Sequence, residues 1–248
     1  MKNVFSDIDQ IRGMMDMREC KFLNRLAGKV IGDFGEKSVF CEIGSFCGKS
    51  TVSIAKALVK HASGVLYAID WHQGASTSLG LEEEEYVSTY GEYLRNLEKF
   101  EVEERIKTIK KRSEDSVNDV PDQIHFLWID GCHDYKNVKL DYCNYEGMVA
   151  PGGFLLFHDA CWTSWEGPFR LIEEEVLYGM DYNFYAMIGN IMVFRKEANT
   201  MNKVSRSALC ALCKCVSGKN RPWHRKIVSA IFFRLTAYYT ILFHNWSK

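Results

Sequence analysis

The residues best suited to chemistry form two groups, a glycine-containing loop and a set of carboxylates and histidines. The loop reads Glu-Ile-Gly-Ser-Phe-Cys-Gly-Lys-Ser over residues 42–50. The second group consists of Asp130, His133, His158 and Asp159, which follow two short apolar runs. Glycines let a ligand approach the main chain, and aspartate and histidine can bind a divalent metal or transfer protons. The sequence therefore indicates a small-molecule ligand beside a site of metal or acid–base chemistry.

The spacing within the loop discriminates between ligand classes. A phosphate-binding P-loop needs four residues between its first Gly and the Gly-Lys-Ser, but only three separate Gly44 from Gly48. A dinucleotide-binding loop needs a middle Gly, which Ser45-Phe46-Cys47 does not provide. In a third interpretation, Glu42 precedes the loop and Asp70 ends the next strand, where a carboxylate can hold the ribose hydroxyls of an adenosine. A tight strand-to-helix turn without a ligand remains the alternative.

Short apolar runs alternate with amphipathic ones between residues 38 and 196, which is typical of β-α-β units and a mostly parallel sheet. Two of these runs, VLYAID and IHFLWID, are apolar up to a terminal Asp, as expected of strands that are buried on both faces. Because parallel strands share one carboxyl edge, both groups of polar residues should meet there. The predicted strands are Ser38–Ile43, Val65–Asp70, Ile106–Ile109, Ile124–Asp130, Phe154–His158, Asn183–Met187 and Ile191–Arg195.

Helices are expected at residues 50–60, after the loop, and at 86–100, where Tyr, Leu and Phe recur every three or four residues. The last two strands flank Ile188-Gly189-Asn190, which predicts a hairpin and an antiparallel last strand. The predicted fold is α/β and Rossmann-like, with a mostly parallel seven-stranded sheet and helices on both faces. We expect three parts: an N-terminal helical segment over 1–37, the main domain over 38–197, and a basic, aromatic, helical C-terminal extension over 198–248.

Several motifs, taken in order, resemble those of class I S-adenosylmethionine-dependent methyltransferases. The resemblance covers about residues 20–196 and is to the group containing macrolide sugar O-methyltransferases and cephalosporin-biosynthesis methyltransferase-like proteins. It implies S-adenosyl-L-methionine as cofactor and O-methylation of a sugar, glycan or other small hydroxylated acceptor. The motifs are the loop at 42–50, YAID at 67–70, KRSEDS at 111–116, IDGCHDY at 129–135 followed by Asp141, APGGFLLFHD at 150–159 and WEGP at 165–168.

The resemblance also assigns cofactor contacts. Asp70 would accept hydrogen bonds from the ribose hydroxyls, and Ser113 would contact the adenine. An ordinary helix N-cap is an equally good explanation of Ser113. The residues expected to bind the cofactor are Glu42, Gly44, Ser45, Gly48, Ser50, Asp70, Ser113 and Asp130.

For the metal, the resemblance implies Mg²⁺ or Mn²⁺ held by Asp130, His158 and Asp159. The chain departs from its metal-dependent relatives, which carry an acidic pair in place of His158-Asp159 and often DGDH in place of Asp-Gly-Cys-His at 130–133. A metal-free site with a histidine base and a purely structural cluster are the alternatives. Since an alcohol becomes a good nucleophile when its proton is removed or its oxygen is polarised, the expected catalytic residues are Asp130, His133 as the first candidate base and His158 as the second.

Residues 198–248 contain nine Lys or Arg and no Asp or Glu, so the formal charge of −1 on the whole chain leaves −10 on residues 1–197. Such a tail can contact an anionic membrane surface, dock on the acidic domain or bind a second copy in a homo-oligomer. Its apolar run at 227–243 is shorter than the roughly 20 residues of a membrane span, which favours a peripheral membrane contact over a spanning helix. Nucleic acid is a disfavoured partner because the rest of the chain is acidic.

The polar start of the chain predicts no signal peptide and a cytoplasmic location, and nine Cys without framework spacing suit reduced thiols. The predicted function is therefore a methyltransferase. The alternative is a non-catalytic Rossmann-type binding module that its basic tail tethers to a membrane or partner. A nucleotide-dependent transferase or oxidoreductase is the third hypothesis.

Overall fold

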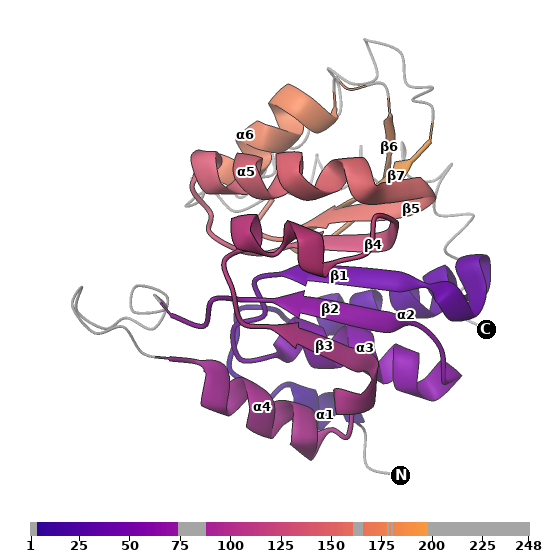
Figure 1. The fold of residues 1–248 in the computed structure, drawn as a ribbon, viewed down its shortest axis with the longest axis vertical. Helices are drawn as coiled ribbons and strands as arrows, with labels where there is room; N and C mark the ends of the chain where they lie inside the picture. Colours follow the sequence, from indigo (N-terminus) through magenta and orange to yellow (C-terminus); the bar gives the residue numbers. More distant parts are fainter. Residues whose placement is uncertain (1–3, 74–87, 161–165, 178, 180, 198–248) are drawn as a thin grey trace, which may run out of the picture.

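The computed structural model describes residues 4–73, 88–160, 166–177, 179 and 181–197 (Figure 1). A seven-stranded sheet has the order β3-β2-β1-β4-β5-β7-β6. Every neighbouring pair is parallel except those of β7, which runs antiparallel to both β5 and β6. The predicted α/β fold with an antiparallel last strand is thus confirmed. The strands are β1 (Val39–Ile43), β2 (Val65–Ile69), β3 (Ile106–Ile109), β4 (Ile124–Ile129), β5 (Val149–Phe157), β6 (Tyr182–Ile188) and β7 (Ile191–Lys196).

Helices cover both faces of this sheet, as the alternating pattern predicted (Figure 1). Because successive strand residues point to opposite faces, β4 contributes Phe126 and Trp128 to a core with α2, α3 and α4, and Leu127 to a core with α5 and α6. The α-helices are α1 (Val4–Ile8), α2 (Met17–Phe34), α3 (Lys49–His61), α4 (Tyr90–Lys99), α5 (Tyr135–Tyr145) and α6 (Glu166–Leu171). The short helices are η1 (Gly35–Lys37), η3 (Glu103–Arg105), η4 (Ser113–Asp115), η5 (Val117–Asp119), η6 (Glu146–Met148) and the π-helical η7 (Ile172–Val176).

Helix α2 begins with a capping box. The Asp16 carboxylate accepts hydrogen bonds from the backbone N–H groups of Arg18 and Glu19, and the Glu19 carboxylate accepts one from the N–H of Asp16. The apolar face of α2 buries Leu23 and Leu26 in the core that α3 and the sheet share. Helix α2 therefore packs on the sheet, whereas α1 packs on α2 and α3.

Strand β5 differs from its prediction by starting at Val149 instead of Phe154. Pairing with β4 steps from Ile124↔Val149 to Phe126↔Phe154, so the intervening residues 150–153 form an irregularity within the strand. Pro151 has no N–H to donate, which made this stretch resemble a turn in the sequence.

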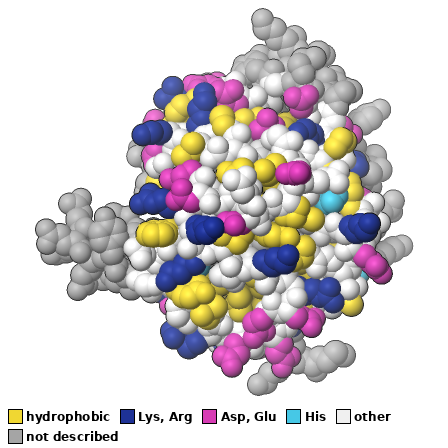
Figure 2. All heavy atoms as spheres, viewed as in Figure 1, with side chains coloured by type: hydrophobic (Ala, Val, Ile, Leu, Met, Phe, Trp, Pro, Cys, Tyr) yellow, Lys and Arg dark blue, Asp and Glu magenta, His cyan; other side chains and the backbone are white. Residues whose placement is uncertain are grey.

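Some predictions fall on residues outside the described ranges, namely the C-terminal extension at 198–248, the beginning of the helix predicted at 86–100, and Trp165 of the WEGP motif. Among the helices that are described, none is both long and apolar enough to cross a membrane. On the face shown in Figure 2, acidic and basic side chains are interspersed with apolar ones. That face therefore presents no single-sign surface to a charged partner.

Candidate active site

The segments that follow β1, β2, β4 and β5 lie side by side at the carboxyl edge of the sheet. The N–H of Gly44 donates to the last carbonyl of β2 at 2.9 Å, and that of Asp130 donates to the last carbonyl of β1 at 2.8 Å. The N–H of His158 bonds to the end of β4 at 3.1 Å, and that of Asp70 bonds to the end of β3 at 3.1 Å. These bonds bring the glycine loop and the acidic strand ends into one site, as predicted from the sequence.

The glycine loop has a backbone that other residues would disrupt. Gly44 has φ +90°, and a Cβ atom placed on it would lie 2.1 Å from the carbonyl oxygen of Asp130. Gly48 is the N-cap of α3 and also has φ +90°, in the left-handed region. Glycine alone adopts such angles at little cost. The loop therefore packs its backbone directly against the residues after β4 and leads into the amino end of α3, whose first N–H groups can contact a ligand.

Beneath the loop, Glu42 is fully buried and accepts three hydroxyl hydrogen bonds. Ser50 donates to one carboxylate oxygen at 2.5 Å, while Thr51 and Ser45 donate to the other at 2.5 and 3.0 Å. Burial raises the pKa of Glu42 and these hydroxyls oppose the shift, with a resulting pKa of about 7. The hydroxyls of Ser45 and Ser50 thus face Glu42 and tie the loop to β1.

Glu42→Gln is expected to stabilise the protein at alkaline pH. The pKa of Glu42 is higher in the folded state than its value of about 4.3 in the unfolded state. The free energy of unfolding of the wild type should therefore be highest below about pH 4.3 and fall as the pH rises to about 7. Gln removes the buried charge, and the hydroxyls can reorient around its amide. We expect a gain of about 1–3 kcal/mol in the free energy of unfolding at pH 8. Urea unfolding at pH 5 and pH 8 measures it.

Glu36→Gln is the control for this prediction, because Glu36 is an exposed carboxylate. It should leave the pH dependence unchanged. A Glu42→Gln variant that keeps the wild-type slope between pH 5 and pH 8 would show that Glu42 does not carry this charge.

The carboxylate of Asp70 fixes two loops and keeps further acceptor capacity. One oxygen accepts from the N–H of Phe46 at 2.7 Å, and the other accepts from the N–H of His72 at 2.6 Å. The side chain is 19% exposed. A carboxylate has about four acceptor sites, so both oxygens can also accept hydrogen bonds from ligand hydroxyls.

Ser113 is held from α5. Its hydroxyl donates a short hydrogen bond to the buried carboxylate of Asp141, and the hydroxyl of Tyr145 donates to its carbonyl at 2.7 Å. Ser113 is the first residue of η4, whose N-cap is Arg112, so the N-cap explanation of Ser113 is wrong. Burial raises the pKa of Asp141 and the Ser113 hydroxyl opposes the shift, giving a pKa of about 6.

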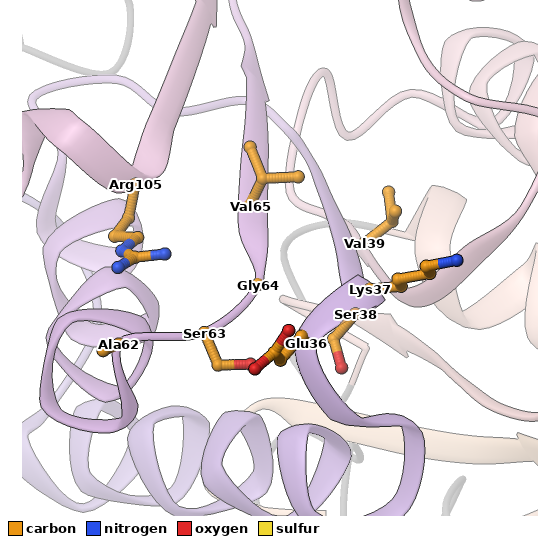
Figure 3. A pocket seen from close by; sticks show the side chains of 9 residues that line it. All are labelled: Glu36, Lys37, Ser38, Val39, Ala62, Ser63, Gly64, Val65 and Arg105. Carbon is orange, nitrogen blue, oxygen red and sulfur yellow. The ribbon is translucent and has the colours of Figure 1, made fainter.

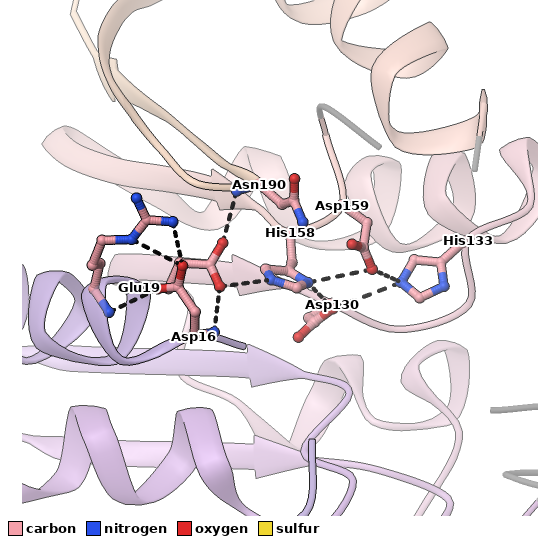
Figure 4. Close-up of polar contacts among 8 residues, drawn as sticks. Asp16, Glu19, Asp130, His133, His158, Asp159 and Asn190 are labelled. Carbon is pink, nitrogen blue, oxygen red and sulfur yellow. Dashed lines mark hydrogen bonds and ion pairs between the residues drawn. The ribbon is translucent and has the colours of Figure 1, made fainter. Parts of the chain in front are cut away.

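Two carboxylates and two imidazoles converge where β4 and β5 end (Figure 4). His133 Nε2 lies 2.9 Å from Asp159 Oδ2 and 3.7 Å from Asp130 Oδ1. His158 Nδ1 lies 3.3 Å from each of these oxygens. Donor atoms of Asp130, His133 and Asp159 lie within 4.8 Å of one another, which is close enough to hold one metal ion. In this cluster His133 is the third donor, whereas the resemblance implied His158.

Charge in this cluster is nearly balanced between acids and imidazoles. Burial lowers the pKa of His133, but Asp130 and Asp159 outweigh it and raise the pKa to about 9. The same aspartates, with Glu19, raise the pKa of the buried His158 well above its ordinary value. Burial raises the pKa of Asp159, yet the two imidazoles hold that pKa far below its usual range. In this arrangement the imidazoles are protonated at neutral pH and paired with the carboxylates.

Two contributors to the site were not assigned from the sequence. Glu19 reaches the cluster from α2, and Asp141 was noted only as part of a motif. The Asp-x-x-Glu pattern at 16–19 marks a helix start, but it carries no information about contact with His158. Sequence spacing alone therefore could not reveal Glu19.

A cavity of about 530 Å³ lies at the opposite edge of the sheet, where β1 and β2 begin (Figure 3). Its lining includes Lys37, Ser63 and Arg105. None of the predicted site residues lines it. Ligands of open α/β sheets bind at the carboxyl ends of the strands, so we place the active site there and not in this cavity.

Comparisons with known proteins identify the domain and the fold. A family described as "Methyltransferase domain" matches residues 41–160. The structure of the O-methyltransferase NovP has a TM-score of 0.62 at 15% identity over 74% of this chain and 81% of that one. An O-methyltransferase from Bacillus cereus in complex with SAH has a TM-score of 0.58 at 15% identity, covering 79% and 92% of the two chains. TomG from Streptomyces achromogenes is an O-methyltransferase involved in tomaymycin synthesis and was solved with SAM. It has a TM-score of 0.58 at 14% identity, over 80% of this chain and 91% of that one.

At these identities the solved structures establish a shared fold, and the family match locates the domain within it. The match begins in β1 and ends just after Asp159, so it contains the glycine loop, Asp70 and the strand ends that form the site. The chain therefore contains a methyltransferase domain and has the class I methyltransferase fold.

Proposed function

We propose that this enzyme transfers a methyl group from S-adenosylmethionine to a hydroxyl oxygen of a small acceptor such as a sugar or glycan. One observation carries the proposal. The glycine loop lies directly against the backbone of Asp130, so the proposed cofactor site would adjoin the Asp–His cluster, which consists of Asp130, His133, His158 and Asp159. O-methyltransferases among the similar folds support the choice of oxygen as the acceptor atom.

The residues at the carboxyl edge suit the three parts of the cofactor. Asp70 would accept the ribose hydroxyls, and Ser113 would contact the adenine. Glu42, with Gly44, Ser45, Gly48 and Ser50, would line the methionine end, where the glycine loop lies against the backbone of Asp130. Asp130 belongs to the Asp–His cluster, and its backbone contacts the loop.

S-adenosylmethionine supplies an electrophilic methyl group, whose bond to sulfur breaks as the bond to the acceptor oxygen forms. The protein must align that oxygen and take up its proton. Asp130, His133 and His158 are the residues placed to orient the hydroxyl. The Asp130 carboxylate could receive the proton directly, whereas either imidazole would receive it only after releasing its own proton. Alignment of the acceptor oxygen with the methyl group can alone contribute several kcal/mol to the rate acceleration, which favours a site whose side chains are held in place.

The donor set also fits a divalent metal. Asp130, Asp159 and His133 would hold it, and His158 is a further candidate because its Nδ1 lies 3.3 Å from both aspartates. An imidazole in the set favours Mn²⁺ over Mg²⁺, which prefers oxygen ligands. When bound, such an ion lowers the pKa of an oxygen that coordinates it.

The test is methyl transfer from S-adenosylmethionine labelled in its methyl group to a panel of monosaccharides, nucleotide-linked sugars and catechols. We expect label in an O-methyl product, identified by NMR. Overnight chelation with EDTA should lower the rate at least about tenfold, and Mn²⁺ should restore it. Full activity after chelation would reject the metal and leave the histidine base. Label on nitrogen or carbon would refute O-methylation.

A further inference from the structure

Glu19 lies outside the matched methyltransferase domain, yet its carboxylate reaches the active site. It projects from the first turn of α2 and is 2% exposed. Figure 4 shows it on the side of His158 that is opposite to Asp130 and Asp159. The Oε2 atom of Glu19 lies 3.7 Å from Nε2 of His158.

The Glu19 carboxylate is held in place from two further directions. One oxygen accepts from the N–H of Asp16 at 2.8 Å and the other accepts from the N–H of Asn190 at 2.7 Å. A Cβ atom on Gly189 would lie 2.3 Å from the carboxylate, so the β6–β7 turn approaches Glu19 as closely as glycine allows. Capping of α2 needs only the hydrogen bond from Asp16. The hydrogen bond from Asn190 therefore fixes the Glu19 carboxylate more firmly than capping requires.

The His158 ring can satisfy its carboxylate neighbours in one orientation only. With Nε2 toward Glu19, Nδ1 lies 3.3 Å from both Asp130 Oδ1 and Asp159 Oδ2. A half-turn of the ring would direct carbon atoms at these carboxylates. Nε2 is buried and has no hydrogen-bond partner among the residues that the structure describes, so Glu19 faces it as an ion-pair partner. The carboxylate of Glu19 thus acts together with the two aspartates to favour the observed orientation, and it does so from the Nε2 edge.

We propose that Glu19 is a positioning residue, which holds the His158 ring by its Nε2 edge so that Nδ1 stays directed at the Asp130–Asp159 pair. The inference rests on the proposed function, because Asp130 and Asp159 belong to the Asp–His cluster that is proposed to act on the acceptor.

The test compares Glu19→Gln with Asp16→Ala in the full chain. Both variants alter one member of the same capping box, but only Glu19 faces His158. NMR on protein with ¹⁵N-labelled histidine, assigned with His158→Asn, measures exchange of the His158 Nε2 proton with water. We expect exchange at least about tenfold faster in Glu19→Gln and Mn²⁺ binding about tenfold weaker, as for other partners of metal-site residues. Asp16→Ala should stay within about twofold of wild type in both measurements.

Gly189→Ala provides a second route if Glu19→Gln does not fold, because its Cβ atom displaces the carboxylate without removing it. It should change proton exchange in the same direction. Unchanged exchange in the folded Glu19 or Gly189 variant, or an equal change in Asp16→Ala, overturns the proposal. Calorimetry with S-adenosylhomocysteine separates the two hypotheses: wild-type protein that does not bind it counts against the proposed function, whereas the exchange result still decides the role of Glu19.

Discussion

Gly44→Ala is expected to weaken binding of S-adenosylhomocysteine by at least about 100-fold and to lower the free energy of unfolding by about 3 kcal/mol. The added Cβ atom would lie 2.1 Å from the carbonyl oxygen of Asp130 and 2.8 Å from Cα of Gly131. Both are backbone atoms and cannot rotate away, so the glycine loop must separate from β4. Calorimetry with S-adenosylhomocysteine and urea unfolding measure the two effects.

Gly32→Ala is the matched control for that variant. Gly32 lies within α2, and no atom lies within 4 Å of the position that a Cβ atom would take there. Alanine should leave cofactor binding unchanged and stabilise the helix by up to about 1 kcal/mol. Gly44→Ala protein that binds S-adenosylhomocysteine as tightly as Gly32→Ala would refute the cofactor role of the loop.

Asp159→Asn is expected to lower the rate of methyl transfer by about 10²–10⁴-fold while cofactor affinity changes less than about threefold. Asp159 has φ +50°, and asparagine tolerates this left-handed region well, so the backbone should be preserved. The substitution removes the charge that faces His133 at 2.9 Å and His158 at 3.3 Å. The measurement is kcat with the acceptor identified by the labelled-methyl assay, beside calorimetry with S-adenosylhomocysteine.

Asp134→Asn is the control for charge removal in the same region. Asp134 caps α5 by accepting a hydrogen bond from the N–H of Asn137, and asparagine caps helices equally well. Its kcat should remain within about twofold of wild type. If Asp159→Asn is as active as Asp134→Asn, the Asp–His cluster does not act on the acceptor.

The sheet could be predicted closely because its strands carry strong local signals. β2 and β4 read as apolar runs that end in Asp70 and Asp130, and both strands end one residue before these aspartates. β5 could not be delimited, because Pro151 and its neighbouring glycines look like a turn and are instead an irregularity in the pairing with β4. Local composition predicts where a strand ends. It does not predict where extra residues interrupt the pairing of that strand with its neighbour.

The candidate site was predictable as a location but not as a network. Parallel topology places Gly44, Asp70 and Asp130 at one edge whatever the details of the loops. Which histidine faces which carboxylate depends on backbone angles such as the positive φ of Asp159, and the sequence contains no sign of them. The approach of Glu19 depends on how α2 crosses the sheet, which is a tertiary property.

The central claim is that the carboxyl edge of the sheet binds an adenosyl ligand through Asp70. Isothermal titration of the full chain with S-adenosylhomocysteine, repeated with Asp70→Ala, tests it most directly. The structure predicts one binding site in the wild-type protein and an affinity at least about 100-fold lower in the variant, with Tm showing that the variant is folded. Wild-type protein that binds no S-adenosylhomocysteine, or an Asp70→Ala variant that binds it equally well, would contradict the claim.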